Sequence, residues 1–297
     1  MLKLIHIINP VKIGETSDLF IAQPITFESM RIAKEFASHE VDVELLTAHF
    51  SEDREIIPDY FTPTKDLHRS VLDLKEFKVR RKLPLIKDIL ERAVNYSDNS
   101  EYIVYTNVDI ALMPHFYLFV KQQIQLGYDS FVINRRTITK QYSKLDQIPL
   151  MYAEVGHNHP GFDCFVFKKN LYNKFILNDV CIGVSKIGVT LLSNLLCFSN
   201  NFRLFHDKAL TFHIGEDKVW QNKILQDYYN FNCDEALKSM TELLLIKPSL
   251  SENPIFEKHF SLLKNPNKDF KTKITIKQRI KKSLVYKVTN KILRFGT

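Results

Sequence analysis

The sequence predicts an α/β fold, in which a mostly parallel, twisted sheet carries helices on both faces and a helical, basic C-terminal extension follows. Short apolar or alternating segments rich in Val, Ile and Tyr recur between residues 2 and 213, as strands do. Segments with apolar residues at helical spacing separate them, and this alternation is typical of a parallel sheet. We expect one large domain over residues 1–250 and an extension over residues 251–297.

The N-terminal half begins with β-α-β patterning. Leu2–Ile8 is a short apolar strand, and apolar residues at helical spacing follow Pro24. Residues 41–46 alternate as a second strand. A second helical stripe follows Pro84 and leads into residues 101–106, which read as a buried strand.

The remaining elements follow the same alternation. We expect strands over residues 130–134, 161–167 and 209–213, and helices over residues 187–196 and 222–246. No firm element is predicted in two polar segments, residues 50–80 and 137–160.

Composition excludes several classes of protein. The hydrophobic content of 45% is that of a soluble globular protein, and no apolar run is long enough for a transmembrane helix. The first residues enter a strand-like pattern rather than that of a signal peptide. Four widely spaced cysteines without a CxxC pair indicate reduced thiols in a cytoplasmic protein, not a disulfide or zinc framework.

The positive charge is concentrated in the C-terminal tail. Residues 271–297 hold nine Lys or Arg and no Asp or Glu, so the net charge of +7 leaves −2 for the rest. A near-neutral body argues against nucleic-acid binding. Apolar residues repeat at i+4 from Ile276 to Ile292, although Lys277 and Lys281 interrupt the apolar arc. We expect this tail to contact an anionic membrane from the cytoplasmic side, the alternatives being a solvated extension or a helix packed on the body.

A polar pair follows the strand over residues 101–106. Asn107 and Asp109 are two residues apart, so in an extended chain their side chains point to the same side. Polar groups at the carboxyl ends of strands are where open α/β sheets bind ligands. Two oxygen ligands suit a hard cation that also holds a diphosphate, whereas the alternative is an Asn-x-Asp turn without a ligand.

A second motif, His213-x-Gly215-x-x-Lys218-x-Trp220, resembles the His-x-Gly-x-x-Lys-Pro-Trp motif of family-eight glycosyltransferases, the group that includes glycogenin and lipopolysaccharide galactosyltransferases. That family has the glycosyltransferase-A fold, and an Asp-x-Asp element ends one of its strands. Val219 stands where the family has Pro, Asn107 replaces the first Asp, and an Asp-Gln dipeptide is missing near residues 183–192. The sequence therefore leaves open whether the chain belongs to another family of the same fold. It also leaves open whether the reaction retains or inverts the configuration of the sugar.

The resemblance implies a role for each of several residues. The metal ligands would be Asp109, His213 and Asn107, holding Mn²⁺ or Mg²⁺; an imidazole suits Mn²⁺ better. Asp163 would orient sugar hydroxyls or act as a base, and Lys218 would neutralise the leaving diphosphate. The donor-binding residues would be Asn9, Arg81, Asn107, Gly215 and Lys218.

Less specific readings accompany these assignments. Asp163 equally fits a carboxylate that caps the turn before its strand. Arg135 and Arg136, which follow a strand, are typical of a solvated charge pair, and His157 and His159 of a surface loop.

The sequence thus predicts metal-assisted transfer of a sugar from a nucleotide-diphosphate donor to a glycan or lipid-linked acceptor. One alternative is a non-catalytic peripheral adaptor that retains the fold, which Asn107 favours. The other is a sugar-phosphate nucleotidyltransferase, which needs a Gly-rich N-terminal loop that residues 9–14 do not show.

Overall fold

The computed structural model describes residues 1–96, 99–215 and 223–264. It divides the chain into two compact units, the first spanning Met1–Pro248 and the second beginning at Ser249. In the second unit, the described residues form the end of a 3₁₀ turn, η7 (Pro248–Glu252), and helix α7 (Pro254–Lys264). No helix in the described ranges is both long and apolar enough to cross a membrane. The basic tail lies outside the described residues.

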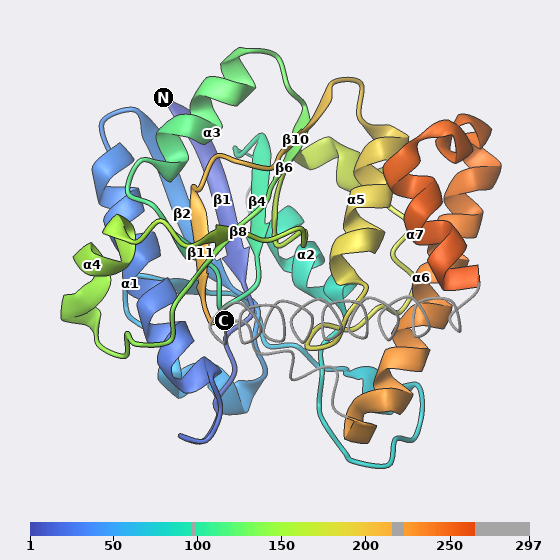
Figure 1. Ribbon diagram of the computed structural model, residues 1–297, viewed down its shortest axis with the longest axis horizontal. Coiled ribbons are helices and arrows are strands. Elements are labelled where there is room, and N and C mark those ends of the chain that lie inside the picture. Colours follow the sequence, from blue (N-terminus) through green and yellow to red (C-terminus); the bar gives the residue numbers. More distant parts are fainter. Residues whose placement is uncertain (97–98, 216–222, 265–297) are drawn as a thin grey trace, which may run out of the picture. The chain divides into compact units, whose positions relative to one another are not determined.

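The first unit is built on a central sheet that is mostly parallel (Figure 1). Among the described residues its seven strands run, from one edge to the other, in the order β10 (Phe202–Phe205), β6 (Ser130–Ile133), β9 (Cys164–Lys168), β4 (Tyr102–Thr106), β1 (Leu2–Ile8), β2 (Val41–Thr47) and β3 (Thr62–Pro63). Only β9 runs antiparallel to its two neighbours. The predicted α/β class with a mostly parallel sheet is therefore confirmed.

Helices cover both faces of this sheet. Alternate residues of β1 and β4, such as Leu4 and Val104, pack with α1 (Leu19–Ala37) and α3 (Phe116–Gln125). The intervening residues turn to the opposite face, because side chains alternate along a strand. On that face α2 (Ile86–Val94) packs against β1 and β4, and α5 (Ile187–Phe198) packs against β6. A longer helix, α6 (Gln226–Ile246), packs against α5.

A second, smaller sheet crosses the region where the carboxyl ends of the main strands lie (Figure 1). Its strand order is β5 (Ala111–Leu112), β11 (Thr211–Ile214), β7 (Arg136–Ile138) and β8 (His157–Asn158). The expected strand over residues 209–213 thus belongs to this sheet and not to the main one. Strands β7 and β8 and the short helix α4 (Ile148–Ala153) also occupy the polar segment for which no element was predicted.

The first helix differs from its prediction at the N-terminus. It begins at Leu19, so Pro24 lies inside the helix rather than in front of it. Gln23, the residue before Pro24, donates to the carbonyl oxygen of Val11 and accepts from the N–H of Val11, both at 2.9 Å. These two bonds fasten the loop after β1 to the first turns of α1. Short 3₁₀ segments complete the first unit: η1 (Ser51–Ile56), η2 (Val71–Asp73), η3 (Leu145–Gln147), η4 (Lys169–Lys174) and η6 (Lys223–Leu225).

A buried histidine in β1 links the sheet to α3. His6 is fully buried; its Nδ1 lies 2.8 Å from the Tyr117 hydroxyl and its Nε2 lies 2.9 Å from the Thr106 hydroxyl. Burial lowers the pKa of His6 from 6.5 to about 3. The ring is therefore neutral at physiological pH, and two hydroxyls, each able to donate or accept, satisfy both of its nitrogens.

This arrangement predicts how stability depends on pH. Below its unfolded pKa of 6.5, His6 binds a proton in the unfolded state but not in the folded state, so the free energy of unfolding falls as the pH drops from 6.5 towards 3. The His6→Gln variant should lack this contribution, about 1.4 kcal/mol per pH unit for one proton. Urea unfolding at pH 7, 6 and 5 measures the difference, with the exposed His39→Gln variant as the control. Parallel pH profiles for wild type and His6→Gln would contradict it.

Candidate active site

The pairing of β9 brings three chain segments to one edge of the main sheet. Cys164, the first residue of β9, pairs with Thr106 at the end of β4 and with Ile133 at the end of β6. Because β9 is antiparallel, the residue before its start lies at the same edge as the residues after the ends of β4 and β6. Asp163 is therefore placed between Asn107 and Arg135.

Side-chain contacts follow this register. Asn107 donates from Nδ2 to Asp163 Oδ1 at 3.3 Å and accepts at Oδ1 from the Tyr105 hydroxyl at 3.0 Å. Arg135 donates from Nε to Asp163 Oδ2 at 2.8 Å. His159 Nδ1 lies 3.9 Å from the same carboxylate oxygen and accepts from the N–H of Gly161. Asp163 thus lies among one amide, one guanidinium and one imidazole.

The second sheet brings Asp109 and His213 together although 104 residues separate them. Strand β5 pairs antiparallel with β11, with Ala111 opposite Phe212. Continuing this register towards lower numbers on β5 brings Asp109 beside the end of β11. His213 Nε2 lies 3.2 Å from Asp109 Oδ2.

The contacts of His213 define which of its ring nitrogens holds a proton. Its Nδ1 lies 2.7 Å from the carbonyl oxygen of Gly215, an atom that only accepts, so Nδ1 must donate. Nε2 faces the Asp109 carboxylate, which also only accepts in its ionised form. The pair is then satisfied either by a second proton on the imidazole or by a cation that both groups bind.

Burial and charge shift the pKa values of the two carboxyl groups in opposite directions. Burial raises the pKa of Asp163, and the nearby Asp109 charge adds to this, although Arg135 acts against it. Burial also acts to raise the pKa of Asp109, but the hydrogen bond and charge of His213 and the charge of Arg135 outweigh it and lower that pKa. Carboxyl groups whose pKa values are pushed apart are typical of sites where the two have different roles.

A divalent cation fits the Asp109–His213 pair. Asp109 Oδ1 is buried and accepts no hydrogen bond from any described residue, so one ligand atom is unused. A carboxylate oxygen and an imidazole nitrogen are ligands that Mn²⁺ accepts. Within the described ranges, however, no group of three or more His, Cys, Asp or Glu could hold a metal. Two protein ligands suit an ion whose other positions are filled by water and phosphate oxygens.

Three further residues, Gly215, Arg81 and Lys218, were predicted to bind the nucleotide-sugar donor. The N–H of Gly215 donates to Ile138 at 2.9 Å; its φ is +77°, and a Cβ there would overlap the Lys140 side chain. Arg81 has an exposed side chain, and its N–H donates to the Tyr228 hydroxyl at 2.8 Å. Lys218 and Trp220 lie outside the described residues.

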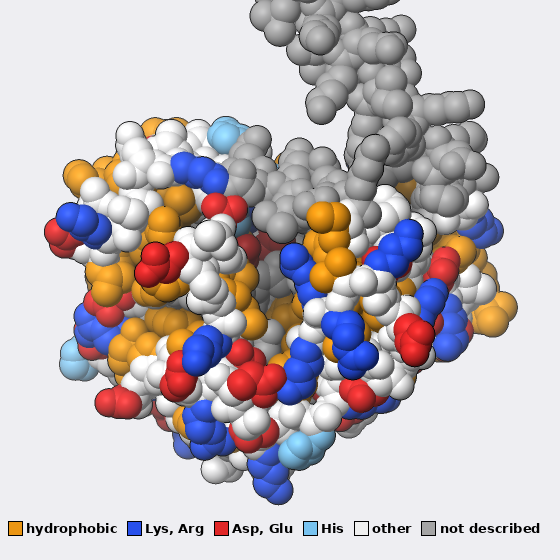
Figure 2. Space-filling view, turned by 90° about the horizontal axis from the view of Figure 1, so that it is seen from below, with side chains coloured by type: hydrophobic (Ala, Val, Ile, Leu, Met, Phe, Trp, Pro, Cys, Tyr) orange, Lys and Arg blue, Asp and Glu red, His pale blue; other side chains and the backbone are white. Residues whose placement is uncertain are grey.

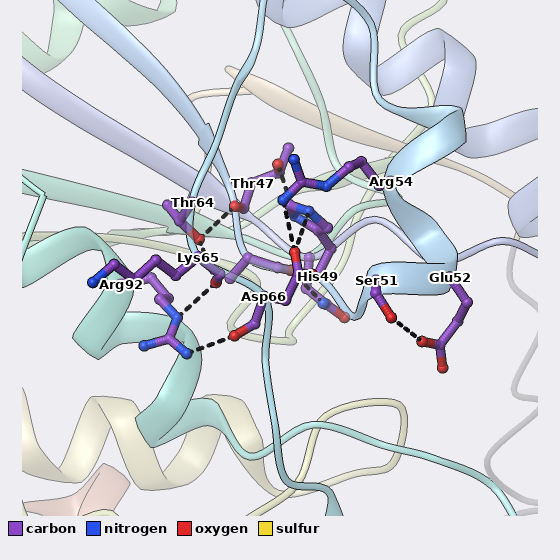
Figure 3. A network of polar contacts seen from close by, with 11 residues as sticks. Thr47, His49, Ser51, Glu52, Arg54, Thr64, Lys65, Asp66 and Arg92 are labelled. Carbon is purple, nitrogen blue, oxygen red and sulfur yellow. Dashed lines mark hydrogen bonds and ion pairs between the residues drawn. The ribbon is translucent and has the colours of Figure 1, made fainter.

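Asn9 lies at the end of β1 and joins two loops. Its Nδ2 donates to the carbonyl oxygen of Ala48 at 2.5 Å, which ties the loop after β1 to the loop after β2. The second loop continues into a polar network around His49 (Figure 3). His49 Nε2 lies 3.4 Å from Asp66, which also pairs with Arg54, and burial lowers the pKa of His49 although Asp66 acts in the other direction. Asn9 therefore has a role in loop structure whether or not it also contacts a ligand.

Two residues have surroundings that differ from their sequence-based interpretation. Arg135 and Arg136 do not form a solvated pair: Arg135 binds Asp163, and the buried Arg136 donates to the carbonyl oxygens of Met151 and Tyr152 near the end of α4. The signal that could have identified Arg135 was its position two residues after a buried strand, at the same edge as Asn107.

The comparisons with known proteins concern the fold. No protein-family model matches the sequence, and a search of curated proteins finds no match. The structure is similar to residues 1–349 of TarS from S. aureus in complex with UDP-GlcNAc, with a TM-score of 0.46, 10% identity, and coverage of 89% of this chain and 81% of that chain.

Two further solved structures are similar at the same level. For GalNAc-T7 with UDP, GalNAc and Mn²⁺, the TM-score is 0.49 and the identity 12%, covering 91% of this chain and 57% of that chain. For the 4-diphosphocytidyl-2C-methyl-D-erythritol synthase of Anaerococcus prevotii, the values are 0.38 and 10%, covering 82% and 98%. At these scores and identities, the similarities assign neither an activity nor a ligand to this chain.

The contacts of Asn107 predict the effect of a charge at this position. In the Asn107→Asp variant two carboxylates would face each other across the 3.3 Å contact, which should raise the pKa of Asp163 further and lower the free energy of unfolding by about 1–2 kcal/mol at pH 7. The double variant Asn107→Asp/Asp163→Asn exchanges donor and acceptor and should recover part of the loss. Urea unfolding measures both; an Asn107→Asp protein as stable as wild type would show that the two side chains are not in contact.

Proposed function

We propose that this protein transfers a sugar from a nucleotide-diphosphate donor to a glycan or lipid-linked acceptor, assisted by Mn²⁺ or Mg²⁺. The observation that carries the proposal is the close approach of Asp109 and His213 beside the Asp163–Arg135 pair, with one buried Asp109 oxygen that accepts no hydrogen bond from the described residues. The Asp109–His213 pair suits the leaving diphosphate of a glycosyl transfer, and the Asp163–Arg135 pair suits the sugar and the acceptor. The His213-x-Gly215-x-x-Lys218 motif adds support from the sequence.

The first half is the leaving group. As the bond between sugar and diphosphate breaks, negative charge develops on the leaving oxygen, and a divalent ion there stabilises it. Asp109 and His213 would hold this ion from the protein side. Lys218 follows His213 by five residues and would add a positive charge at the diphosphate.

The second half is the sugar and the acceptor. Asp163 accepts hydrogen bonds from Asn107 and Arg135, which hold its carboxylate between them. This geometry is suited to binding sugar hydroxyl groups in one orientation. Its raised pKa also suits a base that removes a proton from the acceptor hydroxyl, which is the role it would take in an inverting reaction. In a retaining reaction it would keep only the first role.

Removal of the charges at the leaving group tests the proposal. Thermal shift against UDP-, GDP-, CMP- and dTDP-sugars, with and without Mn²⁺, identifies the donor. With that donor, Asp109→Ala and Lys218→Ala should each lower turnover by about 10²–10³, since each removes a group that stabilises developing charge. The matched control is Asp207→Ala, because Asp207 is exposed and pairs only with its neighbour Lys208 in the described part of the chain. Wild-type turnover in either site variant would remove that residue from the mechanism.

The same assay separates transfer from nucleotidyl chemistry. A glycosyltransferase hydrolyses or transfers from a nucleotide-diphosphate sugar, whereas a nucleotidyltransferase releases diphosphate from a nucleoside triphosphate and a sugar phosphate. Donor binding with no turnover of either kind would favour a non-catalytic adaptor.

We further propose that residues 271–297 bind an anionic membrane. Nine cations at about 1 kcal/mol each near an anionic surface are enough to hold a protein there.

Deletion of residues 271–297 should abolish co-sedimentation with anionic vesicles and leave turnover of a soluble acceptor unchanged. Binding of the full chain should weaken steeply with salt, because exposed charges are screened beyond about 8 Å at physiological ionic strength. If the deletion instead lowers the melting temperature markedly, the tail is part of the fold.

A further inference from the structure

Residues 75–82, called the basic loop below, carry a dense positive charge on the first unit. Five of these eight residues are Lys or Arg and one is Glu, and all five cationic residues are exposed. Lys82 pairs with Glu52 and lies 4.0 Å from the centre of the Phe50 ring. In the described ranges no carboxylate pairs with the side chains of the other four cations, Lys75, Lys78, Arg80 and Arg81. Among the described residues, the charge of these four side chains is therefore not neutralised by an ion pair.

The backbone of the basic loop is held in place by α6. The Phe77 ring stacks on Tyr228 with centroids 3.9 Å apart and planes at 7°. The Tyr228 hydroxyl donates to the carbonyl oxygen of Val79 at 2.7 Å and accepts from the N–H of Arg81 at 2.8 Å. The N–H of Lys78 donates to Asp227 at 2.8 Å. Binding by such a fixed loop loses less conformational entropy than binding by a free chain.

Aliphatic side chains are exposed among these cations. Leu74 is 42% exposed, Val79 is 40% exposed and Ile224 is 53% exposed. Each lies within three residues in sequence of a buried member of one core cluster, which includes Phe77, Leu225 and Tyr228. Single exposed aliphatic residues are ordinary, but aliphatic residues interleaved with Lys and Arg are typical of surfaces that enter the interface of a bilayer. A soluble polyanion would make no use of them.

The basic loop borders the edge of the sheet that carries the candidate site. Glu52, the partner of Lys82, lies in η1, which follows the carboxyl end of β2. Asp109 follows β4, which runs in the same direction, so both segments lie at one edge. Figure 2 looks onto this edge and shows Lys and Arg side chains, with apolar side chains among them, beside the hollow at its centre.

We propose that the basic loop, together with Leu74, Val79 and Ile224, is a docking surface for an anionic lipid bilayer. The cations bind lipid phosphate groups and the aliphatic side chains enter the interface. These residues do not include the C-terminal tail, and the proposal does not depend on the donor chemistry proposed above. It orients the first unit so that the edge carrying Asp109 and Asp163 lies next to the membrane.

The test compares two charge-matched variants of the full chain. Lys75→Glu/Lys78→Glu changes the loop, and Lys3→Glu/Lys238→Glu makes the same change at exposed residues at the start of β1 and within α6. We expect the loop variant to bind vesicles of phosphatidylcholine and phosphatidylglycerol at least about 30-fold more weakly than the control, since two contacts of about 1 kcal/mol each are lost. Equal binding of the two variants would overturn the proposal.

A second variant isolates the aliphatic contribution. Leu74→Ser/Val79→Ser should weaken vesicle binding several-fold, and the loss should persist at high salt, where charge contacts are screened. Inorganic polyphosphate is the comparison ligand: if the loop charges change polyphosphate binding but not vesicle binding, the surface recognises a soluble anion and the proposal is wrong. Thermal shift with the nucleotide sugar reports on donor binding independently, so its failure would affect only the proposed function.

Discussion

The pairing of β9 between β4 and β6 is the constraint on which the candidate site depends. A purely parallel sheet brings only the ends of strands to its carboxyl edge. By running antiparallel, β9 brings the start of a strand to that edge as well, and so places Asp163 between the residues that follow β4 and β6. The small sheet then adds His213 from a strand that never joins the main sheet. The site thus combines four segments of chain that strand pairing brings to one place.

Its electrostatics follow from these placements. Two carboxylates lie in a mostly buried region, where each would be costly without a cation nearby. Asp109 is paired with the imidazole of His213, and Asp163 is paired with the guanidinium of Arg135. The two partners differ in their chemistry. Arg135 only donates hydrogen bonds and does not bind metal ions, whereas a histidine imidazole is a common metal ligand. The Asp163 pair therefore needs no ion to complete it, while the Asp109 pair offers two groups of the kind that bind a metal ion.

The sequence predicted the parts of the fold that depend on local pattern. The strand from Leu2 and the buried strand before Asn107 were placed correctly because a short, nearly continuous apolar run is typical of a strand buried on both faces. The two-residue strand β5 and the three-residue strand β7 were not, because such short segments have no detectable periodicity. Arg135 was misread for a related reason: its partner Asp163 is 28 residues away, and only the register of β9 brings them together. The contact between Asp109 and His213 could be suggested by motif, but its geometry depends on β5.

The antiparallel direction of β9 determines where the sequence can vary without moving the charged residues of the site. The long excursion from β6 to β9 leaves the main sheet after Ile133 and returns to it at Cys164, the two residues that face each other in the ladder. Both ends of the excursion are thus held by one residue pair of the sheet, so insertions or deletions in its loops, outside β7 and β8, would leave Asp163 and Arg135 in place. Loop length adds little to the entropic cost of closing such a connection. Natural variation can therefore reshape this rim of the site while the charged centre is inherited unchanged.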